Sequence, residues 1–279
     1  MYTHSVKNKV ILITGGSGGI GSAIVNKLSS SYANIVSVYH KKLPADKANE
    51  NVFWIKADLT IPNEWELILS YTIKKFGRID ALINCTGNFE PGDFSSLEEN
   101  EVGKMIELNL TSVIIGIHKT LKIFKEEDSG HIINIGSLGG IVPMPYSSVY
   151  CATKFALRGF TFSLAEELRE TGIKISLITP GAVITGMLDY EAQNSNTAIA
   201  FISKPISPLK VANEVLKVIR KPQSEVIIPQ SVSIASRLLT FSPKIFSTLY
   251  GLLHRIGLFR KRNYLNQYCN FTLARGLSK

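Results

Sequence analysis

Short apolar runs alternate with longer helical patterns from the first residues to about residue 228. Most of these runs are continuously apolar instead of alternating with polar residues, which is typical of strands buried on both faces of a parallel sheet. The predicted strands span residues 10–14, 35–39, 52–56, 81–84, 131–135, 174–178 and 226–228.

The segments between these runs carry apolar residues at helical spacing. The predicted helices span roughly residues 19–31, 62–76, 97–125, 148–171 and 208–220. Repeated strand–helix–strand units predict an α/β fold with a doubly wound parallel sheet, the Rossmann fold. No linker interrupts the pattern, so we expect a single catalytic domain over residues 1–228, followed by an extension over residues 229–279.

The extension contains one further helical pattern. Ser242 and Pro243 form a good helix start, with serine as N-cap and proline at the first helical position. The apolar residues after this start recur at helical spacing and are expected on one face: Ile245, Phe246, Leu249, Leu252, Leu253 and Ile256. The pattern predicts a basic amphipathic C-terminal helix.

The positive charge of the chain lies in this extension. The net charge is +9, and residues 226–279 hold eight basic and no acidic residues, which leaves the main body at about +1. A basic amphipathic helix can lie on an anionic membrane surface, so peripheral membrane contact is one expectation. The alternatives are packing on the body or on a partner subunit, or a lid over an apolar pocket. A neutral body without a binding motif argues against nucleic acid.

The cysteines and the N-terminal residues indicate in which cellular compartment the protein is expected. Cys85, Cys151 and Cys269 lack metal-ligand spacing, and three thiols cannot all pair, so we expect a reducing environment and no metal site. The N-terminal residues lack the long apolar region and cleavage site of a signal peptide. We therefore expect a cytoplasmic protein, with membrane association as a possibility left open by the basic helix.

A glycine-rich turn follows the first predicted strand. Residues 14–21 read TGGSGGIG and lead directly into the first helix. In this position Gly15 would allow a tight turn, Gly19 would let backbone approach a phosphate, and Gly21 would let the helix pack closely on the strand. The helix N-terminus adds unpaired N–H groups for an anion. The pattern predicts dinucleotide binding; a glycine turn without a ligand is the alternative.

The end of the second strand indicates which dinucleotide is preferred. Enzymes that select the 2′-hydroxyl of NAD(H) place an acid about 20 residues after the glycines. Here His40, Lys41 and Lys42 follow the strand, and the first acid is Asp46. This favours NADP(H) over NAD(H), although the two lysines could also be a solvated loop.

Four polar residues follow in an order that carries a resemblance. Asn109 lies in a predicted helix, Ser137 follows the fifth strand, and Tyr150 and Lys154 open the next helix in SVYCATK. Together with the TGGSGGIG turn, their order and strand context resemble the short-chain dehydrogenase/reductase family. The resemblance covers about residues 7–228 and implies that these four residues form a catalytic tetrad.

The resemblance also implies a set of cofactor-binding positions. NCTG at residues 84–87 corresponds to the family's NNAG segment but departs from it at two middle positions. Asp58 matches the acid whose loop holds the adenine, and the segment from Pro180 matches PGxVxT, which contacts the nicotinamide. The expected cofactor residues are Gly15, Ser17, Gly18, Gly19, Ile20, Gly21, Tyr39, His40, Lys41, Asp58, Leu59, Asn84, Thr86, Gly87, Tyr150, Lys154, Pro180, Gly181, Val183 and Thr185.

The expected chemistry follows from the acidity of a phenol. Free tyrosine has a pKa of about 10, and a nearby Lys154 ammonium together with an oxidised nicotinamide would lower the pKa of Tyr150 toward the working range. Tyr150 would then be the general acid and base, and Ser137 would stabilise the substrate oxygen. By resemblance alone, Lys154 would hold the nicotinamide ribose and Asn109 would position a proton-relaying water.

The expected activity is the NADP(H)-dependent interconversion of a carbonyl and a secondary alcohol. The loops at residues 138–147 and 183–208 carry Ile141, Val142, Met144, Tyr146, Met187, Leu188, Tyr190 and Phe201, which favours a lipophilic substrate such as a 3-oxoacyl, steroid-like or aromatic ketone. A catalytically silent regulator or scaffold of the same fold and an epimerase or dehydratase are the alternatives. The resemblance implies a homodimer or homotetramer.

Overall fold

The predicted strands form one seven-stranded parallel sheet in the computed structural model, which describes residues 6–43, 50–194, 196–233 and 243–269. The strand order is β3-β2-β1-β4-β5-β6-β7, so the direction of winding reverses between β1 and β4. The predicted doubly wound α/β fold is confirmed. The strands are β1 (Val10–Thr14), β2 (Asn34–Tyr39), β3 (Val52–Lys56), β4 (Ala81–Asn84), β5 (Gly130–Ile135), β6 (Ile173–Pro180) and β7 (Glu225–Ile228).

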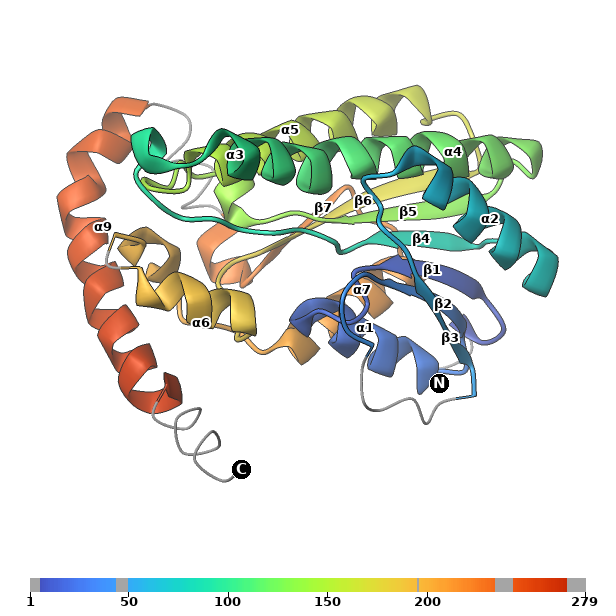
Figure 1. The fold of residues 1–279 in the computed structure, drawn as a ribbon, viewed down its shortest axis with the longest axis horizontal. Coiled ribbons are helices and arrows are strands. Elements are labelled where there is room, and N and C mark those ends of the chain that lie inside the picture. Colours follow the sequence, from blue (N-terminus) through green and yellow to red (C-terminus); the bar gives the residue numbers. More distant parts are fainter. Residues whose placement is uncertain (1–5, 44–49, 195, 234–242, 270–279) are drawn as a thin grey trace.

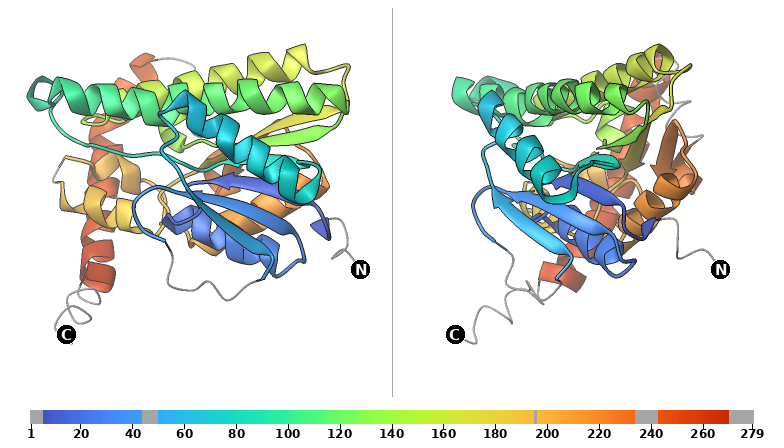
Figure 2. Two further views of the ribbon diagram at one scale, coloured as in Figure 1. Left: turned by 45° about the vertical axis from the view of Figure 1, so that its right-hand side comes forward. Right: turned by 90° about the vertical axis from the view of Figure 1, so that its right-hand side faces the viewer.

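Helices cover both faces of this sheet (Figure 1). The longer ones are α1 (Gly19–Ser29), α2 (Pro62–Phe76), α3 (Glu99–Ile106), α4 (Ser112–Glu126), α5 (Ser148–Glu167), α6 (Gly186–Gln193), α7 (Pro208–Arg220) and α9 (Pro243–Tyr264). The short ones are η2 (Phe94–Ser96), η3 (Glu107–Thr111), η4 (Leu138–Gly140), η5 (Ala198–Phe201), η6 (Gln230–Val232) and η7 (Leu265–Cys269). Helices α1 and α7 pack on one face, and α2, α4 and α5 pack on the other (Figures 1 and 2).

The two helix layers explain why the strands are apolar throughout. In β1, Ile11 and Ile13 belong to the core beneath α1 and α7, whereas Leu12 belongs to the core beneath α2 and α4. Successive side chains of a strand point to opposite faces, so both sets are buried here. The sheet therefore has no solvent-facing side, and its carboxyl edge is where a ligand can bind.

The predicted helix at residues 97–125 is divided in the structure. It begins with α3 at Glu99, where Glu98 and Glu101 form a reciprocal capping box. One π-helical turn, η3, then separates α3 from α4. The sequence pattern merged these elements because the backbone stays helical across the junction, with only one wider turn. Helix α6 and the turn η5 also lie in a segment where we predicted only a loop.

Helix α9 stands at the carboxyl side of the sheet, beside α6 and η5 (Figure 1). It begins at Pro243, and the predicted N-cap Ser242 and the acid Asp46 lie outside the described residues. A Cβ on Gly257 would lie 2.1 Å from the backbone oxygen of Ala198 in η5, so only glycine allows this close contact.

The apolar residues predicted for α9 lie on one arc of the helix, but only one edge of this arc packs on the body. Phe246 is buried and Leu253 is half-buried against the body, whereas Ile245, Leu249 and Leu252 are exposed. The apolar arc of α9 is wide enough for its two edges to face different surroundings. One edge packs on the body of the protein, and the other is exposed. Within the described ranges, every helix is too short or too polar to cross a membrane.

Candidate active site

The glycine turn links β1 to α1 at the switch point of the sheet. Gly15 has φ +65°, a left-handed conformation that L side chains rarely adopt. A Cβ there would also lie 2.9 Å from the backbone of Thr86, and a Cβ on Gly21 would lie 2.1 Å from the oxygen of Gly15. The predicted turn and close helix packing are both present, and the N-terminus of α1 faces the carboxyl edge of the sheet.

The NCTG segment borders this turn. Thr14 Oγ1 accepts hydrogen bonds from the backbone N–H groups of Cys85 at 3.1 Å and Thr86 at 3.4 Å. Asn84 points into the sheet instead, where its Nδ2 donates to Asn134 Oδ1 at 2.9 Å. The Thr86 hydroxyl is buried and has no hydrogen-bond partner among the described residues. Such an unpaired group next to a phosphate-binding turn fits a polar ligand at this edge.

A cleft of about 500 Å³ opens between the glycine turn and the ends of β2 and β3. The predicted cofactor residues that line it are Gly15, Ser17, Gly18, Tyr39, His40, Lys41, Asp58, Leu59, Thr86 and Gly87. Lys42 lines it as well, and no acid occurs from Tyr39 to Leu43. Its size, glycine floor and basic edge fit the adenosine half of a dinucleotide.

The one carboxylate among the described lining residues of this cleft is Asp58. It accepts hydrogen bonds from both the backbone N–H and the hydroxyl of Thr60, at 3.0 and 2.7 Å. The imidazole Nε2 of His40 lies 3.7 Å from Asp58 Oδ2. The Thr60 bonds, and to a smaller extent the facing His40, lower the pKa of Asp58. Asp58 is thus held as a carboxylate by Thr60, and His40 lies at the rim.

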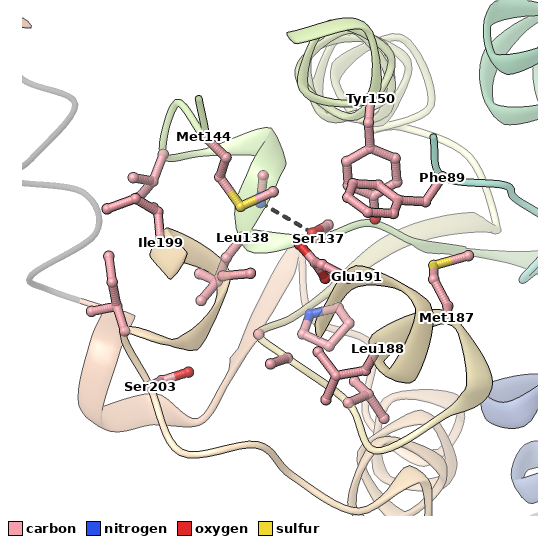
Figure 3. Close-up of a pocket in the computed structure, with 18 of the residues that line it drawn as sticks. Phe89, Ser137, Leu138, Met144, Tyr150, Met187, Leu188, Glu191, Ile199 and Ser203 are labelled. Carbon is pink, nitrogen blue, oxygen red and sulfur yellow. Dashed lines mark hydrogen bonds between the residues drawn. The ribbon is translucent and has the colours of Figure 1, made fainter. Parts of the chain in front are cut away.

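Ser137 and Tyr150 meet at the centre of the site (Figure 3). Ser137 follows β5, and its Oγ accepts a hydrogen bond from the N–H of Gly139 at 3.0 Å. Tyr150 lies in the first turn of α5, where its ring meets Phe89 edge to face at a centroid distance of 5.0 Å. Burial raises the pKa of Tyr150, while a hydrogen bond with Ser137 acts in the opposite direction. The protein alone therefore keeps the phenol protonated.

Lys154 lies one helical turn below Tyr150 and is buried. Its Nζ donates to the backbone oxygen of Ile135 at 3.2 Å and lies 5.7 Å from the centroid of the Tyr150 ring. Burial lowers the pKa of Lys154 to about 8. An amine with that pKa is still mostly charged at neutral pH.

Asn109 is buried in the π turn η3, opposite Lys154. Its side-chain amide pairs with the backbone of Asn88, accepting at 2.8 Å and donating at 2.9 Å. A Cβ on Gly87 would lie 3.2 Å from Asn109 Oδ1 and 3.7 Å from Lys154 Nζ, so both groups border the same small space. The π turn fits this role, since such turns are frequent at functional sites.

A second cavity of about 210 Å³ begins at Ser137 and Tyr150. Five further predicted cofactor residues line this cavity at its inner end: Ile20, Pro180, Gly181, Val183 and Thr185. Gly19 adjoins this group, because a Cβ on Gly19 would lie 2.5 Å from Thr185 Cγ2. This end of the cavity is therefore the place where a nicotinamide ring would fit.

The outer end of the cavity is apolar. Of the eight apolar residues predicted for the substrate loops, those that line it are Val142, Met144, Met187 and Leu188. The other four lie elsewhere: Ile141 and Phe201 are core residues, and Tyr146 and Tyr190 are exposed. Leu253 of α9 completes the wall. Loop sequence alone does not distinguish a side chain facing the cavity from one facing the core.

The lining residues that the sequence analysis did not name include Phe89 and Glu191. Phe89 follows NCTG after one intervening residue, Asn88. Its position just beyond the carboxyl end of β4 could have indicated that it lines the site. Glu191 in α6 is the one carboxyl group among the described residues that line this cavity (Figure 3). Burial raises the pKa of Glu191 to about 8, and Lys261 of α9 lowers it. No sequence signal marks it, because its inward direction depends on the packing of α6.

Lys261 connects this carboxyl group to the C-terminal helix. It is buried, and its Nζ donates to the backbone oxygen of Asn194 and to Thr197 Oγ1, the latter at 3.2 Å. Thr197 in turn donates to the backbone oxygen of Glu191 at 2.6 Å. Helix α9 therefore holds the segment that carries Glu191. Within the described residues, no group of His, Cys, Asp and Glu could hold a metal ion.

Sequence comparisons show which family this chain resembles. A profile of the family described as short chain dehydrogenase matches residues 9–196. An uncharacterized oxidoreductase of Staphylococcus saprophyticus is 36% identical over 67% of this chain and 79% of its own length. A 3-alpha-(or 20-beta)-hydroxysteroid dehydrogenase of Mycobacterium tuberculosis is 31% identical over 71% of this chain and 78% of its own.

Solved structures share the fold. ElxO, solved with NADP bound, superposes with a TM-score of 0.72 and 26% identity over 79% of this chain and 97% of its own. A short chain dehydrogenase of Leptospira borgpetersenii, solved with NAD+ bound, gives a TM-score of 0.73 over 82% of this chain and 94% of its own. The second is 24% identical, so it supports the fold alone.

Proposed function

The chain belongs to the short-chain dehydrogenase family of oxidoreductases, and from this premise we propose that it interconverts a carbonyl and a secondary alcohol with NADP(H) as cofactor. The observation that carries the proposal is the meeting of Ser137 and Tyr150 in the wall of the smaller cavity, with the Lys154 ammonium beneath the phenol. A silent regulator or scaffold would not need this arrangement, and no observation favours an epimerase or dehydratase.

Each polar group has a separate task in this proposal. Ser137 donates a hydrogen bond to the substrate oxygen, while its Oγ accepts one from the N–H of Gly139. Tyr150 gives its proton to that oxygen during reduction and takes it back during oxidation. When bound, the nicotinamide supplies or accepts the hydride.

Lys154 and Asn109 support the phenol. The Lys154 ammonium favours the phenolate form of Tyr150 because opposite charges attract in a buried site. It would also bond the ribose of the cofactor. Asn109 keeps the loop after β4 in place through Asn88, and the space that it shares with Lys154 beside Gly87 would hold a water that returns protons to the amine.

The preference for NADP(H) is supported by the edge of the larger cleft. His40, Lys41 and Lys42 line it, and the carboxylate that would repel a 2′-phosphate is absent from the end of β2. Asp58 lies deeper, where Thr60 holds it and His40 faces it. The NADP bound to ElxO, a relative of 26% identity, supports the same assignment.

The substrate we propose is lipophilic and carries a second polar group. Phe89, Met144 and Leu188 supply apolar walls, in agreement with the relative of M. tuberculosis that is named for acting on hydroxysteroids. Glu191 interrupts these walls with a carboxyl group close enough to Tyr150 to raise the phenol's pKa. It would pair with a hydroxyl or a second carbonyl of the substrate. We place the enzyme in the cytoplasm as a homodimer or homotetramer.

A panel of aliphatic, aromatic and steroid ketones tests this function. The purified protein is assayed with NADPH and with NADH for loss of the reduced nicotinamide absorbance. We expect turnover of at least one lipophilic ketone with NADPH, and turnover lower by about 100-fold or more in the Tyr150→Phe variant. Tyr146→Phe is the matched control, since Tyr146 is exposed and does not line the cavity. Equal turnover by Tyr150→Phe would refute the assignment.

A further inference from the structure

Helix α9 carries a stripe of exposed apolar side chains on the surface. The stripe consists of Ile245 (43% exposed), Leu249 (38%), Leu252 (59%) and Phe259 (67%). Their spacing is close to whole helical turns, so they lie in line along one side of the helix. We refer to these four residues as the outer stripe. Large apolar groups exposed in line over one helix are typical of an interaction surface.

The outer stripe is fixed in direction because the adjoining side of α9 is firmly packed. Phe246, Tyr250 and Leu253 contact the apolar cluster around Ile141 and Ile227. Farther along, the Tyr264 hydroxyl donates to Asp189 Oδ1 at 2.6 Å, and Lys261 bonds Thr197. The helix cannot turn its outer stripe inward without losing these contacts. Figure 1 shows α9 at the left edge of the molecule, with no other described element outside it in that view.

Basic side chains follow the outer stripe. Lys244, Arg255 and Arg262 leave the helix about a quarter of a turn from it, on the side away from the packed residues. All three are exposed, and residues 243–269 contain no acid. This order of packed face, apolar stripe and basic edge matches a helix that lies in the interface of an anionic membrane. A second copy of the chain would bring the same cations together, which disfavours a subunit contact here.

We propose that the outer stripe docks on an anionic lipid surface, with Lys244, Arg255 and Arg262 at the headgroups and the four apolar side chains below them. Leu253 of the same helix lines the substrate cavity, so docking would bring that cavity close to the lipid. The docking stands on surface features alone and does not depend on the reaction catalysed. It would hold even if the oxidoreductase assignment failed.

Vesicle cosedimentation of the full-length protein tests the proposal. Phosphatidylcholine vesicles with and without phosphatidylserine separate the charged from the neutral surface. We expect binding to the anionic vesicles, and a loss of at least about tenfold in affinity for the double variant Leu252→Ser/Phe259→Ser, since two exposed apolar anchors are removed. Arg255→Gln/Arg262→Gln should weaken binding to the same vesicles and reduce its salt dependence.

The matched control is Leu67→Ser/Phe94→Ser, whose two side chains are 65% and 63% exposed away from α9. This control should bind vesicles like the wild type. Circular dichroism and sedimentation velocity accompany each variant. Absence of binding to anionic vesicles, equal binding to neutral ones, or an equal loss in the control would overturn the proposal. So would dissociation of an oligomer in Leu252→Ser/Phe259→Ser, because the stripe would then be a subunit contact.

Discussion

Lys154 Nζ lies 5.7 Å from the centroid of the Tyr150 ring and is tied to the backbone oxygen of Ile135 at 3.2 Å. The amine is thereby held between the end of β5 and the underside of the phenol. Burial shifts both groups toward their neutral forms, since it raises the pKa of Tyr150 and lowers that of Lys154 to about 8, at which the amine is still mostly charged at neutral pH. In the proposed function, the charged amine favours the phenolate because opposite charges attract.

Removing the phenol hydroxyl should lower kcat strongly without loss of cofactor binding. We expect Tyr150→Phe to lower kcat by about 100-fold to 10,000-fold, the range contributed by a general acid or base. The ring would still pack against Phe89, so NADPH affinity measured by fluorescence titration should stay within a few-fold of wild type. A variant that loses affinity and fold together would point to a structural role for the hydroxyl instead.

Replacing Lys154 by methionine should lower activity without lowering the stability of the fold. The pKa of Lys154 falls from 10.5 to about 8 on folding. The buried charge therefore lowers the free energy of unfolding by its full amount below pH 8, and this destabilisation disappears as pH rises from 8 to 10.5. The destabilisation is at most about 3 kcal/mol. In Lys154→Met the Ile135 oxygen loses its hydrogen-bond donor. This costs about 1–3 kcal/mol and offsets part of the stability gained by removing the buried charge.

We therefore expect Lys154→Met to unfold in urea at the wild-type midpoint or above it at pH 7, while kcat/KM falls sharply. Urea titrations at pH 7 and at pH 10 check the sign, because any advantage of the variant should shrink at the higher pH. A large destabilisation at pH 7 would contradict the assigned charge penalty.

Lys41 should discriminate between the two nicotinamide cofactors. A charge-assisted hydrogen bond to a 2′-phosphate contributes about 1.5–3 kcal/mol, so Lys41→Ala should lower kcat/KM for NADPH by about 10-fold to 100-fold. The value for NADH should not change, since its 2′-hydroxyl carries no charge. Lys74→Ala is the control, an exposed lysine on α2 remote from the cleft. Equal losses with both cofactors would count against a phosphate contact.

Glu191 should impose a pH dependence on stability. Its pKa rises from 4.5 to about 8 on folding, so the folded state holds a proton that the unfolded state has lost between these values. Stability contributed by this group is therefore complete below pH 4.5 and decreases as pH rises to about 8. Glu191→Gln removes the dependence, and its Tm advantage over wild type should grow from pH 5 to pH 8. A constant difference across this range would show that Glu191 ionises normally.

Much of the fold and of the site could be predicted from the sequence. Each strand lies within two residues of its predicted bounds, because strands buried on both faces leave a continuous apolar run between polar turns. Gly15, Ser137, Tyr150 and Lys154 could be proposed because the chain order of the motifs follows the order of the strands, and their roles remain predictions. Their distances and hydrogen bonds came only with the structure.

What could not be predicted depends on contacts between distant segments. The π turn at Asn109 adds one wider turn to a helix whose apolar pattern is unbroken. Glu191 faces the cavity because α6 is held by Lys261 and Tyr264, which lie far along the chain. The division of α9 into a packed and an exposed side likewise depends on what it contacts. A helical pattern reveals an apolar arc but not how many surfaces share it.

The contact between Gly257 and Ala198 separates chemistry from selectivity in this chain. Reduction would be carried out by residues of the sheet edge, whereas the depth of the outer cavity depends on how closely α9 approaches η5. A methyl group at position 257 would push the helix outward and move Leu253 with it. Substrate size could therefore change through the last helix while the catalytic residues stay as they are. In the proposed function, the C-terminal segment is therefore the natural place to alter the range of substrates.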